Sequence, residues 1–160
     1  GNTTFVEQLV ERFDTVCETV TVVVGAHHRP IREALGKRAE VIRAHDWFLG
    51  MRASLRAGLR AIPDGPVLLT HVDRPTVHSG TLVELVSAPG NVAVVPVYRG
   101  RSGHPVRIPN WMRTRLEKAD QMPLRDLLKR SGFQPLSVND PGVLVNINDR
   151  RDYHLLRARG

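Results

Sequence analysis

The sequence predicts an α/β fold in which a mostly parallel sheet is covered by helices on both faces. Short runs of Val, Ile and Leu alternate along the chain with segments of helical periodicity, which is the pattern of successive β-α-β units. Several of these runs are apolar at nearly every position, as expected for strands that helices cover on both sides. With 160 residues and no repeat, low-complexity tract or linker, the chain is expected to form one domain over residues 1–160.

The first helix is expected over residues 3–17, where Phe5, Leu9 and Phe13 recur four residues apart and where Asn2 or Thr3 can cap the start. An apolar stripe indicates another helix over 50–62. Pro, Gly or Ser residues at segment ends mark the other helices, at 29–36, 79–88 with Ser79 as its cap, 111–119, 123–131 and 150–158. Strands are expected at 19–26, 39–44, 65–73, 91–98, 134–140 and 142–148, with a Gly-rich loop at 100–108 that runs into a further extended piece.

Composition narrows the classes of function. The net charge of +7 favours anionic partners such as nucleotides or phosphorylated small molecules. Only 5% of the residues are aromatic and none interleaves with a basic run, so nucleic acid is not expected as a partner. Cys17 is the only cysteine, which excludes an intrachain disulfide and favours a plain buried thiol. No apolar run is long enough for a membrane span and no signal peptide opens the chain, so a cytoplasmic protein without a membrane partner is expected.

Polar side chains follow the predicted strand 65–73, and in such sheets ligands bind outside the carboxyl ends of the strands. Asp73 comes directly after the apolar run, so its carboxylate is expected at this edge, where it could hold Mg²⁺ or cap the next helix. Pro75 follows Asp73 closely, and Ser79 is better placed to cap the next helix, so metal binding is the favoured role of Asp73. His71 lies two residues earlier on the same strand face and is expected to line the same site.

Two glycine-containing segments are further candidates for ligand contact. "GMRASLRAG" (50–58) starts a helix, and free N–H groups at a helix start attract phosphate or polar base edges. Gly50, Ser54 and Gly58 form a face of small side chains, which allows either a ligand or another backbone to approach closely. The loop "YRGRSGHPV" (98–106) combines glycines, arginines and a histidine, although no P-loop Lys-Ser/Thr follows it.

Four segments together carry a resemblance to a known family. "GMRASLRAGL", "LLTHVDRPTV", "VVPVYRGRSGHPV" and "DPGVLVNINDRRDY" occur in the order and spacing of MobA-like nucleotidyltransferases, and they are most similar to the molybdenum cofactor cytidylyltransferase branch. The resemblance implies a Rossmann-like three-layer α/β/α sandwich of the nucleotide-diphospho-sugar transferase type. It also implies an Mg²⁺-dependent enzyme that moves a nucleoside monophosphate from a nucleoside triphosphate, with CTP favoured, to a phosphorylated acceptor such as molybdopterin cofactor, releasing pyrophosphate.

The resemblance also implies roles for particular residues. Asp73 matches the family's metal-binding Asp. The segment near the nucleotide is matched by Gly50, Met51 and Ser54, with His71 and Asp73 beside them. The loop that faces the acceptor is matched by Arg101, Gly103, His104 and Pro105. A molybdoenzyme or its chaperone is a further partner that this resemblance implies.

The C-terminal motif departs from this branch, which usually reads Asp-Ile-Asp-Thr-Pro-Glu-Asp. Here Asn146 and Asn148 replace the first two aspartates of that motif. "NDRRDY" (148–153) is instead similar to the Val-Asn-x-Arg stretch of bacterial N-acetylglucosamine-1-phosphate uridyltransferases, whose Asn is the second metal ligand. By this resemblance Asn148 shares the metal with Asp73, since an amide oxygen is a hard neutral donor suited to Mg²⁺. The alternative is that Asn148 caps the last helix.

The family's opening strand and its loop, Leu-Ala-Ala-Gly-x-Ser-x-Arg-Met-Gly, have no counterpart in this sequence. The first residues match the helix after that loop, so we expect the sequence to lack an N-terminal piece that includes the first strand. Three hypotheses follow: a cytidylyltransferase-like enzyme, a sugar-phosphate nucleotidyltransferase suggested by "NDRRDY", or a degenerate, non-catalytic module that binds a nucleotide or a pterin.

Overall fold

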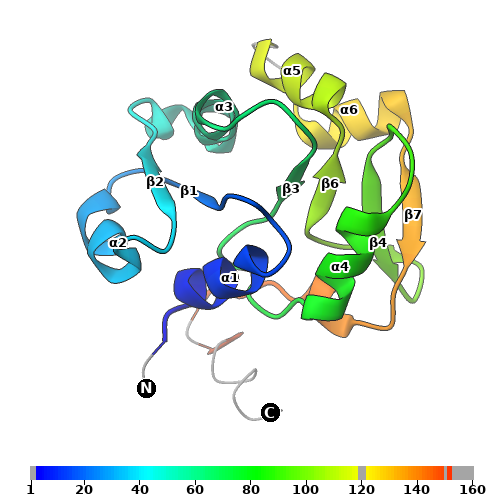
Figure 1. The fold of residues 1–160 in the computed structure, drawn as a ribbon, viewed down its shortest axis with the longest axis horizontal. Helices are drawn as coiled ribbons and strands as arrows, with labels where there is room; N and C mark the ends of the chain where they lie inside the picture. Colours follow the sequence, from blue (N-terminus) through cyan, green and yellow to red (C-terminus); the bar gives the residue numbers. More distant parts are fainter. Residues whose placement is uncertain (1–2, 119–121, 150, 153–160) are drawn as a thin grey trace.

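The computed structural model describes residues 3–118, 122–149 and 151–152 and has alternating helices and strands (Figure 1). The α-helices are α1 (Phe5–Asp14), α2 (His28–Leu35), α3 (Met51–Ala61), α4 (Ser79–Ser87), α5 (Asn110–Lys118) and α6 (Leu124–Ser131), and the 3₁₀ helices are η1 (Trp47–Leu49) and η2 (Pro141–Leu144). The strands are β1 (Thr21–Val24), β2 (Glu40–Arg43), β3 (Val67–Leu69), β4 (Val94–Tyr98), β5 (Arg101–Ser102), β6 (Val106–Ile108) and β7 (Gln134–Ser137).

The strands form two separate hydrogen-bonded sheets. β1 pairs with β2 in parallel, and the larger sheet has the order β3-β6-β4-β5, with β7 paired to β4 in parallel. β6 is antiparallel to both β3 and β4, and β5 is antiparallel to β4. β3, β4 and β7 therefore run in one direction, and the carboxyl ends of these strands lie on the same side of the molecule.

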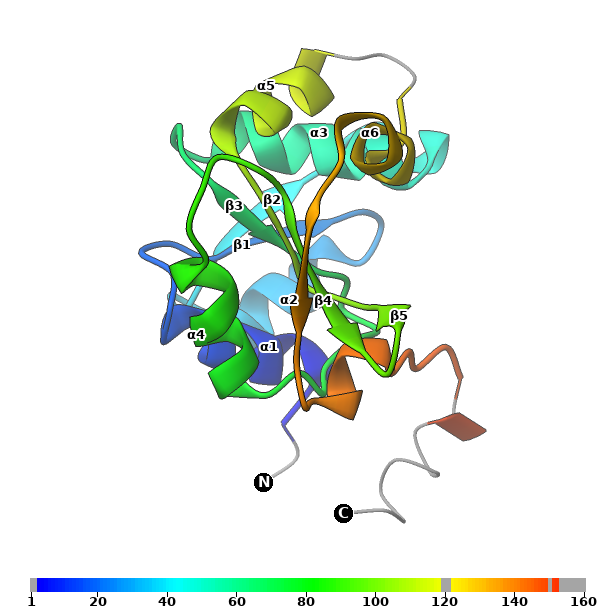
Figure 2. The same cartoon turned by 90° about the vertical axis from the view of Figure 1, so that its right-hand side faces the viewer.

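Helices cover both faces of the strands, as the sequence predicts (Figures 1 and 2). The neighbouring residues Val94 and Val95 of β4 lie on opposite faces of the sheet, because alternate side chains of a strand point to opposite faces. Val95 packs in a core with α3, α5 and α6, whereas Val94 packs against α4. On the same face as α4, the α1 residues Leu9 and Phe13 pack against Leu82.

The starts of two helices differ from the sequence prediction. The N-cap of α1 is Thr4 rather than Asn2 or Thr3, and Thr4 forms a reciprocal capping box with Glu7. The N-cap of α4 is His78, and Ser79 is the first helical residue. The predicted cap was wrong. The carboxylate of Asp140, from a distant segment described below, accepts a hydrogen bond from His78 N at the start of this helix.

The strand predicted at 142–148 is wrong. Residues 141–144 form η2, and the segment that follows it pairs with no strand among the described residues. Pro141 lacks an N–H group, Asp140 caps η2 by accepting from Gly142 N, and Gly142 is packed on the Thr76 carbonyl. These contacts turn the backbone away from an extended path. Of the helix predicted at 150–158, only residues 151–152 are described, as helical, and the rest lies outside the described residues.

Cys17 lies just beyond α1 and is half-buried, and burial raises the pKa of its thiol. Within the described ranges, no helix combines the length and the apolar character needed to cross a membrane.

Candidate nucleotide and metal site

Asp73 lies where the chain leaves β3, at the carboxyl edge of the larger sheet. Its Oδ1 atom is buried and has no hydrogen-bond partner among the described residues. A buried carboxylate oxygen without a partner is costly, and such atoms commonly mark a site for an ion or another ligand. The alternative role as a cap of α4 is not supported, because the N-cap of that helix is His78.

The segment before Asn148 runs alongside Asp73. Ile147 N donates to the Asp73 carbonyl oxygen over 2.8 Å, so the neighbouring Asn148 lies next to this part of the chain. The alternative that Asn148 caps the following helix is not supported, because Asp149 Oδ1 accepts from Asp152 N and thereby occupies the cap position. Asn148 is exposed, and its backbone N–H donates to Asp152 Oδ2 over 2.9 Å.

The donor set around Asp73 fits a hard divalent cation better than zinc. No group of three or more His, Cys, Asp or Glu side chains that could hold a metal occurs within the described part of the chain. Zinc sites need three or four such ligands, whereas Mg²⁺ is usually bound by one or two protein oxygens together with phosphates and waters. Asp73, with the amide of Asn148 in the adjacent segment, suits the second kind of site.

Two histidines meet beside Asp73. The rings of His71 and His104 contact each other edge-on with their centroids 5.3 Å apart. Burial, together with the nearby positive charge of Arg74 and the imidazole of His71, lowers the pKa of His104 to about 4. His104 is therefore neutral near pH 7, and its buried Nδ1 has no partner among the described residues.

The loop that carries His104 is held tightly in place. Gly103 N donates to the Pro96 carbonyl oxygen over 2.8 Å, and His104 N donates to the Val143 carbonyl oxygen over 2.9 Å. A Cβ atom on Gly103 would lie 2.8 Å from the carbonyl carbon of Val143, so only glycine allows this approach. The buried Pro105 follows directly. Close packing against η2 thus fixes the position of the His104 ring.

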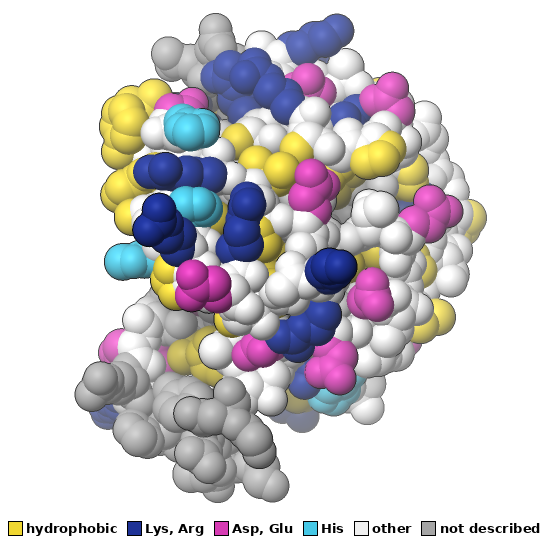
Figure 3. Space-filling view, turned by 60° about the vertical axis from the view of Figure 1, so that its left-hand side comes forward, with side chains coloured by type: hydrophobic (Ala, Val, Ile, Leu, Met, Phe, Trp, Pro, Cys, Tyr) yellow, Lys and Arg dark blue, Asp and Glu magenta, His cyan; other side chains and the backbone are white. Residues whose placement is uncertain are grey.

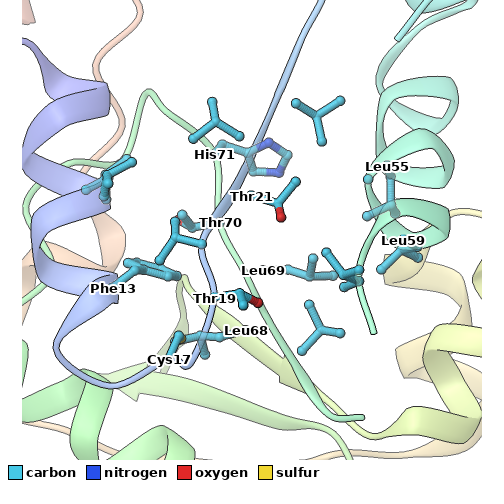
Figure 4. A pocket seen from close by; sticks show the side chains of 18 of the residues that line it. Phe13, Cys17, Thr19, Thr21, Leu55, Leu59, Leu68, Leu69, Thr70 and His71 are labelled. Carbon is cyan, nitrogen blue, oxygen red and sulfur yellow. The ribbon is translucent and has the colours of Figure 1, made fainter. Parts of the chain in front are cut away.

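Four of the five residues predicted near the nucleotide line one cavity of about 790 Å³. Met51, Ser54, His71 and Asp73 all line it, and Figure 4 shows His71 at one end above the apolar residues of β3. Gly50 has a φ of 102° and is the N-cap of α3, whose first turn receives no hydrogen bond from a capping side chain. Gly50 is not among the residues that line the cavity, whereas the exposed Met51 that follows it is.

Gly58 has the packing role that the sequence left open. A Cβ atom there would come within 2.6 Å of Val23 Cγ2, so Gly58 permits α3 to lie directly on β1. Ser54, one turn earlier, lines the cavity, as Gly58 also does.

The residues predicted to bind the acceptor do not line this cavity. Arg101 is exposed at the start of β5, opposite Tyr98 in the hairpin that Arg99 and Gly100 close. Of the predicted acceptor segment, His104 is the residue that reaches the cavity lining, through its contact with His71.

Sequence reasoning missed Asp140, which anchors this edge. Its side chain is 2% exposed and accepts from His78 N, Thr81 Oγ1 and Gly142 N, each over 2.8 Å. It therefore joins the start of α4 to η2, the element that holds the His104 loop. The available signal was the tripeptide Asp-Pro-Gly at 140–142, since Asp commonly caps a segment that opens with Pro.

The molecule carries a net charge of +7, but its basic side chains are not gathered in one patch on the face shown in Figure 3. In the space-filling view, Lys and Arg side chains lie in separate groups, with hydrophobic, acidic and His side chains between them (Figure 3). The exposed hydrophobic residues include Trp47, Phe48, Leu49 and Met51, where the chain leads into α3.

An α/β sandwich with a carboxylate at a strand edge, a helix start without a capping side chain and a net charge of +7 suits a class of proteins that handle nucleotides. Residues 1–136 match the family model of the MobA-like NTP transferase domain, and the chain belongs to that family. This confirms the family that the sequence motifs indicate, whose members are nucleotidyltransferase enzymes.

Individual relatives agree with this family. The molybdenum cofactor cytidylyltransferase of Escherichia coli (strain K12) is 20% identical over 147 residues, which are 89% of this chain and 76% of the relative. A nucleotidyl transferase from Methanothermobacter superposes with a TM-score of 0.82 at 25% identity, covering 99% of this chain and 81% of that one.

A Mycobacterium tuberculosis H37Rv protein solved in complex with manganese has a TM-score of 0.80 at 20% identity, over 98% of this chain and 87% of that one. The 2-C-methyl-D-erythritol 4-phosphate cytidylyltransferase of Thermus thermophilus has a TM-score of 0.71 at 19% identity, over 100% and 91% of the two chains. These neighbours confirm the predicted fold of the nucleotide-diphospho-sugar transferase type.

Proposed function

We propose that this protein is a divalent-metal-dependent nucleotidyltransferase that moves a nucleoside monophosphate from CTP to a phosphorylated acceptor of the molybdopterin type, releasing pyrophosphate. Mg²⁺ is the proposed metal, the cytoplasm the proposed location, and a molybdoenzyme or its chaperone the proposed recipient of the product. The similarity to the E. coli cytidylyltransferase supports the choice of CTP and of the acceptor.

One observation carries the proposal: the buried Asp73 Oδ1 without a partner at the carboxyl edge of β3. Asp73 and Asn148 are the proposed protein ligands of the metal. A bound divalent cation would neutralise charge on the phosphates as the acceptor attacks. This chemistry needs no protein nucleophile, because positioning and charge stabilisation account for most of the catalysis in phosphoryl transfer.

The other residues are proposed to position the substrates. The helix start at Gly50, with Met51 and Ser54, would receive the nucleotide through free N–H groups and small side chains. His104, uncharged near pH 7, can donate or accept one hydrogen bond toward the acceptor without repelling the cations around it. Arg101, Gly103 and Pro105 are the remaining residues proposed for the acceptor side.

The test measures pyrophosphate release from CTP, with a molybdopterin-type acceptor and Mg²⁺, for the unmodified protein and for Asp73→Asn. We expect Asp73→Asn to lower the rate by about 100-fold or more, because a neutral amide replaces the charged ligand. Asp14→Asn is the matched control, since Asp14 is an exposed acid at the end of α1, and its rate should be unchanged. Equal rates for Asp73→Asn and the unmodified protein would refute the metal assignment.

A second candidate, a sugar-phosphate nucleotidyltransferase, is favoured by the position of Asn148 next to Asp73. Comparing CTP, GTP and UTP, each with a pterin phosphate and with a sugar 1-phosphate, separates the two reactions. Turnover only with UTP and the sugar phosphate would replace our proposal with this candidate. Nucleotide binding without turnover of any pair would indicate the non-catalytic module.

A further inference from the structure

Polar atoms without partners gather in the segment that follows β3. Thr70 Oγ1, Asp73 Oδ1 and Arg74 Nε are buried there without a hydrogen-bond partner, and so is His104 Nδ1 of the neighbouring loop. These are four of the six side-chain atoms of this kind among the described residues. Thr70 and Asp73 line the cavity, and His104 reaches its lining through His71. Because buried polar atoms are normally paired, several exceptions at one place indicate a ligand with more than one polar atom.

Arg74 contrasts with two other arginines that lie at least partly inside the protein. Arg12 donates to two backbone carbonyl oxygens, and Arg113 donates to Asp64 and to two further carbonyl oxygens. The half-buried Arg74 side chain has no such hydrogen bond or ion pair to a described residue, and its Nε atom is fully out of contact with water. A charge that is withdrawn from water without a counter-ion is costly, so this guanidinium suits an anionic ligand.

The backbone on either side of Arg74 is fixed. Arg74 N donates to the His71 carbonyl oxygen over 3.1 Å, which closes a turn directly after the strand. Pro75 follows and is completely buried, and its carbonyl oxygen accepts from the Arg12 guanidinium of α1. The side chain of Arg74 therefore starts from a well-defined position next to Asp73.

The charges of Arg74 and Asp73 act on the same imidazole. Burial is the main cause of the low pKa of His104, and the positive charge of Arg74 is the next. The carboxylate of Asp73 acts on this pKa in the opposite direction. The three side chains therefore lie close together at the carboxyl edge of the sheet, although they come from two segments of the chain.

The donors and acceptors at this place select the kind of ligand. The Nε–H of Arg74 can only donate, whereas the Asp73 carboxylate can only accept a hydrogen bond or bind a cation. A phosphate group suits the first, because a guanidinium can donate to two phosphate oxygens at once through Nε–H and Nη–H. The divalent cation proposed above suits the second, and it offsets the repulsion between carboxylate and phosphate. An apolar or a cationic ligand would leave Arg74 without a partner.

We propose that Arg74 binds a phosphate group of a substrate, donating its Nε–H and one Nη–H to two oxygens of that group beside the Asp73 carboxylate. The inference rests on the proposed function, which supplies the cation at Asp73 and the phosphorylated substrates. It adds a substrate-binding residue to the site. The phosphate of the acceptor and the phosphates of the nucleotide offer the same chemistry, so the experiment has one arm for each.

The first measurement is phosphate binding without turnover. Inorganic phosphate is titrated into the ¹⁵N-labelled protein in the presence of Mg²⁺, and the arginine Nε–H resonances are followed by NMR. The resonance that is missing from the spectrum of Arg74→Lys belongs to Arg74, and it should shift and saturate. The backbone amides of Asp73 and Thr76 give the dissociation constant for each variant. Arg74→Met should raise this constant at least tenfold, since a hydrogen bond to a charged group is lost, which corresponds to roughly tenfold or more in affinity.

Two variants and a salt serve as controls. Arg74→Lys keeps the charge but not the planar fork, so its dissociation constant should lie between those of the unmodified protein and Arg74→Met. Arg125→Met removes an arginine that is 81% exposed on α6, and it should bind phosphate as the unmodified protein does. Sodium chloride at the same ionic strength should leave the Arg74 resonance in place.

Urea unfolding separates substrate binding from a structural role. Arg74→Met removes a charge that has no partner in the fold, so the urea midpoint should stay the same or rise. Arg113→Met removes three hydrogen bonds, and its midpoint should fall clearly. A loss of stability in Arg74→Met as large as that in Arg113→Met would show a structural role and overturn the proposal.

Steady-state kinetics identifies the source of the phosphate. An acceptor KM that rises at least tenfold in Arg74→Met, with the KM for CTP unchanged, assigns Arg74 to the acceptor. The reverse pattern assigns it to the nucleotide. Unchanged KM values for both substrates would overturn the proposal, and so would equal phosphate dissociation constants for Arg74→Met and the unmodified protein. If the unmodified protein turns over none of the nucleotide and acceptor pairs, the proposed function fails, while the phosphate titration still decides the role of Arg74.

Discussion

Removing the buried carboxylate of Asp140 should destabilise the protein and loosen the edge that carries the candidate site. Asp140→Ala leaves the His78 N–H, the Thr81 hydroxyl and the Gly142 N–H without their acceptor. Each lost bond of this kind costs about 1–3 kcal/mol when the donor stays buried, and the donor of His78 can partly recover by binding water. The expected loss is about 4 kcal/mol of the free energy of unfolding, a large part of the stability of a typical domain.

Two further substitutions test this origin of the effect. In Asp140→Asn, the amide oxygen can replace Oδ2 for His78 and Thr81, but the amide NH₂ then faces the N–H of Gly142, so about 2 kcal/mol should be lost. Thr81→Val removes a single bond and should cost about 1 kcal/mol. In the Asp140→Ala background, Thr81→Val should cost close to nothing, because its partner is already absent.

Urea unfolding followed by circular dichroism gives these free energies, with Asp14→Ala as the control for an exposed acid. Two outcomes would contradict the reasoning. One is an Asp140→Ala protein that is as stable as the unmodified one to within about 0.5 kcal/mol. The other is an equal cost of Thr81→Val in both backgrounds, which would show that the two side chains do not interact.

The remaining predictions concern His104 and two glycines. The pKa of His104 is lowered to about 4, so between about pH 6.5 and pH 4 the unfolded chain binds a proton at this histidine that the folded chain does not bind. The free energy of unfolding should therefore decrease as the pH falls through this range. His104→Gln should make this decrease smaller, which urea midpoints measured near pH 4.5 and pH 7 would show. Gly103→Ala places a Cβ against the Val143 backbone and should cost about 2–3 kcal/mol in the same assay. Gly80→Ala, in an open position of α4, should be neutral or stabilising by about 0.5 kcal/mol, and an equal cost for both glycines would contradict this explanation.

Much of the fold could be predicted because the signals for its elements are local. The helices around Phe5, Met51 and Leu82 and the strands around Val22 and Val95 follow from apolar periodicity, which a chain carries in any window of about ten residues. Residues of two of the four family motifs, Met51 and Ser54 of the first and His71 and Asp73 of the second, line one cavity.

The elements that were predicted wrongly depend on distant contacts. His78 rather than Ser79 caps α4 because Asp140, from a segment more than 60 residues later, accepts from that helix start. The residues after Pro141 turn into η2 because of packing on Thr76, which no local pattern reveals. β6 lies between β3 and β4 and is antiparallel to both, and this position likewise depends on pairing between segments that are distant in the sequence.

The sequence by itself determined the kinds of element, their order and the residue types available for metal, nucleotide and acceptor. It did so because periodicity, turn residues and motifs act over a few positions along the chain. Only the tertiary structure decided which polar atoms remain without partners, as Asp73 Oδ1 does among the described residues, and which strand edges remain open there, as in β1 and β3. Burial and pairing depend on segments that approach from elsewhere in the chain, so they exist only once the fold has formed.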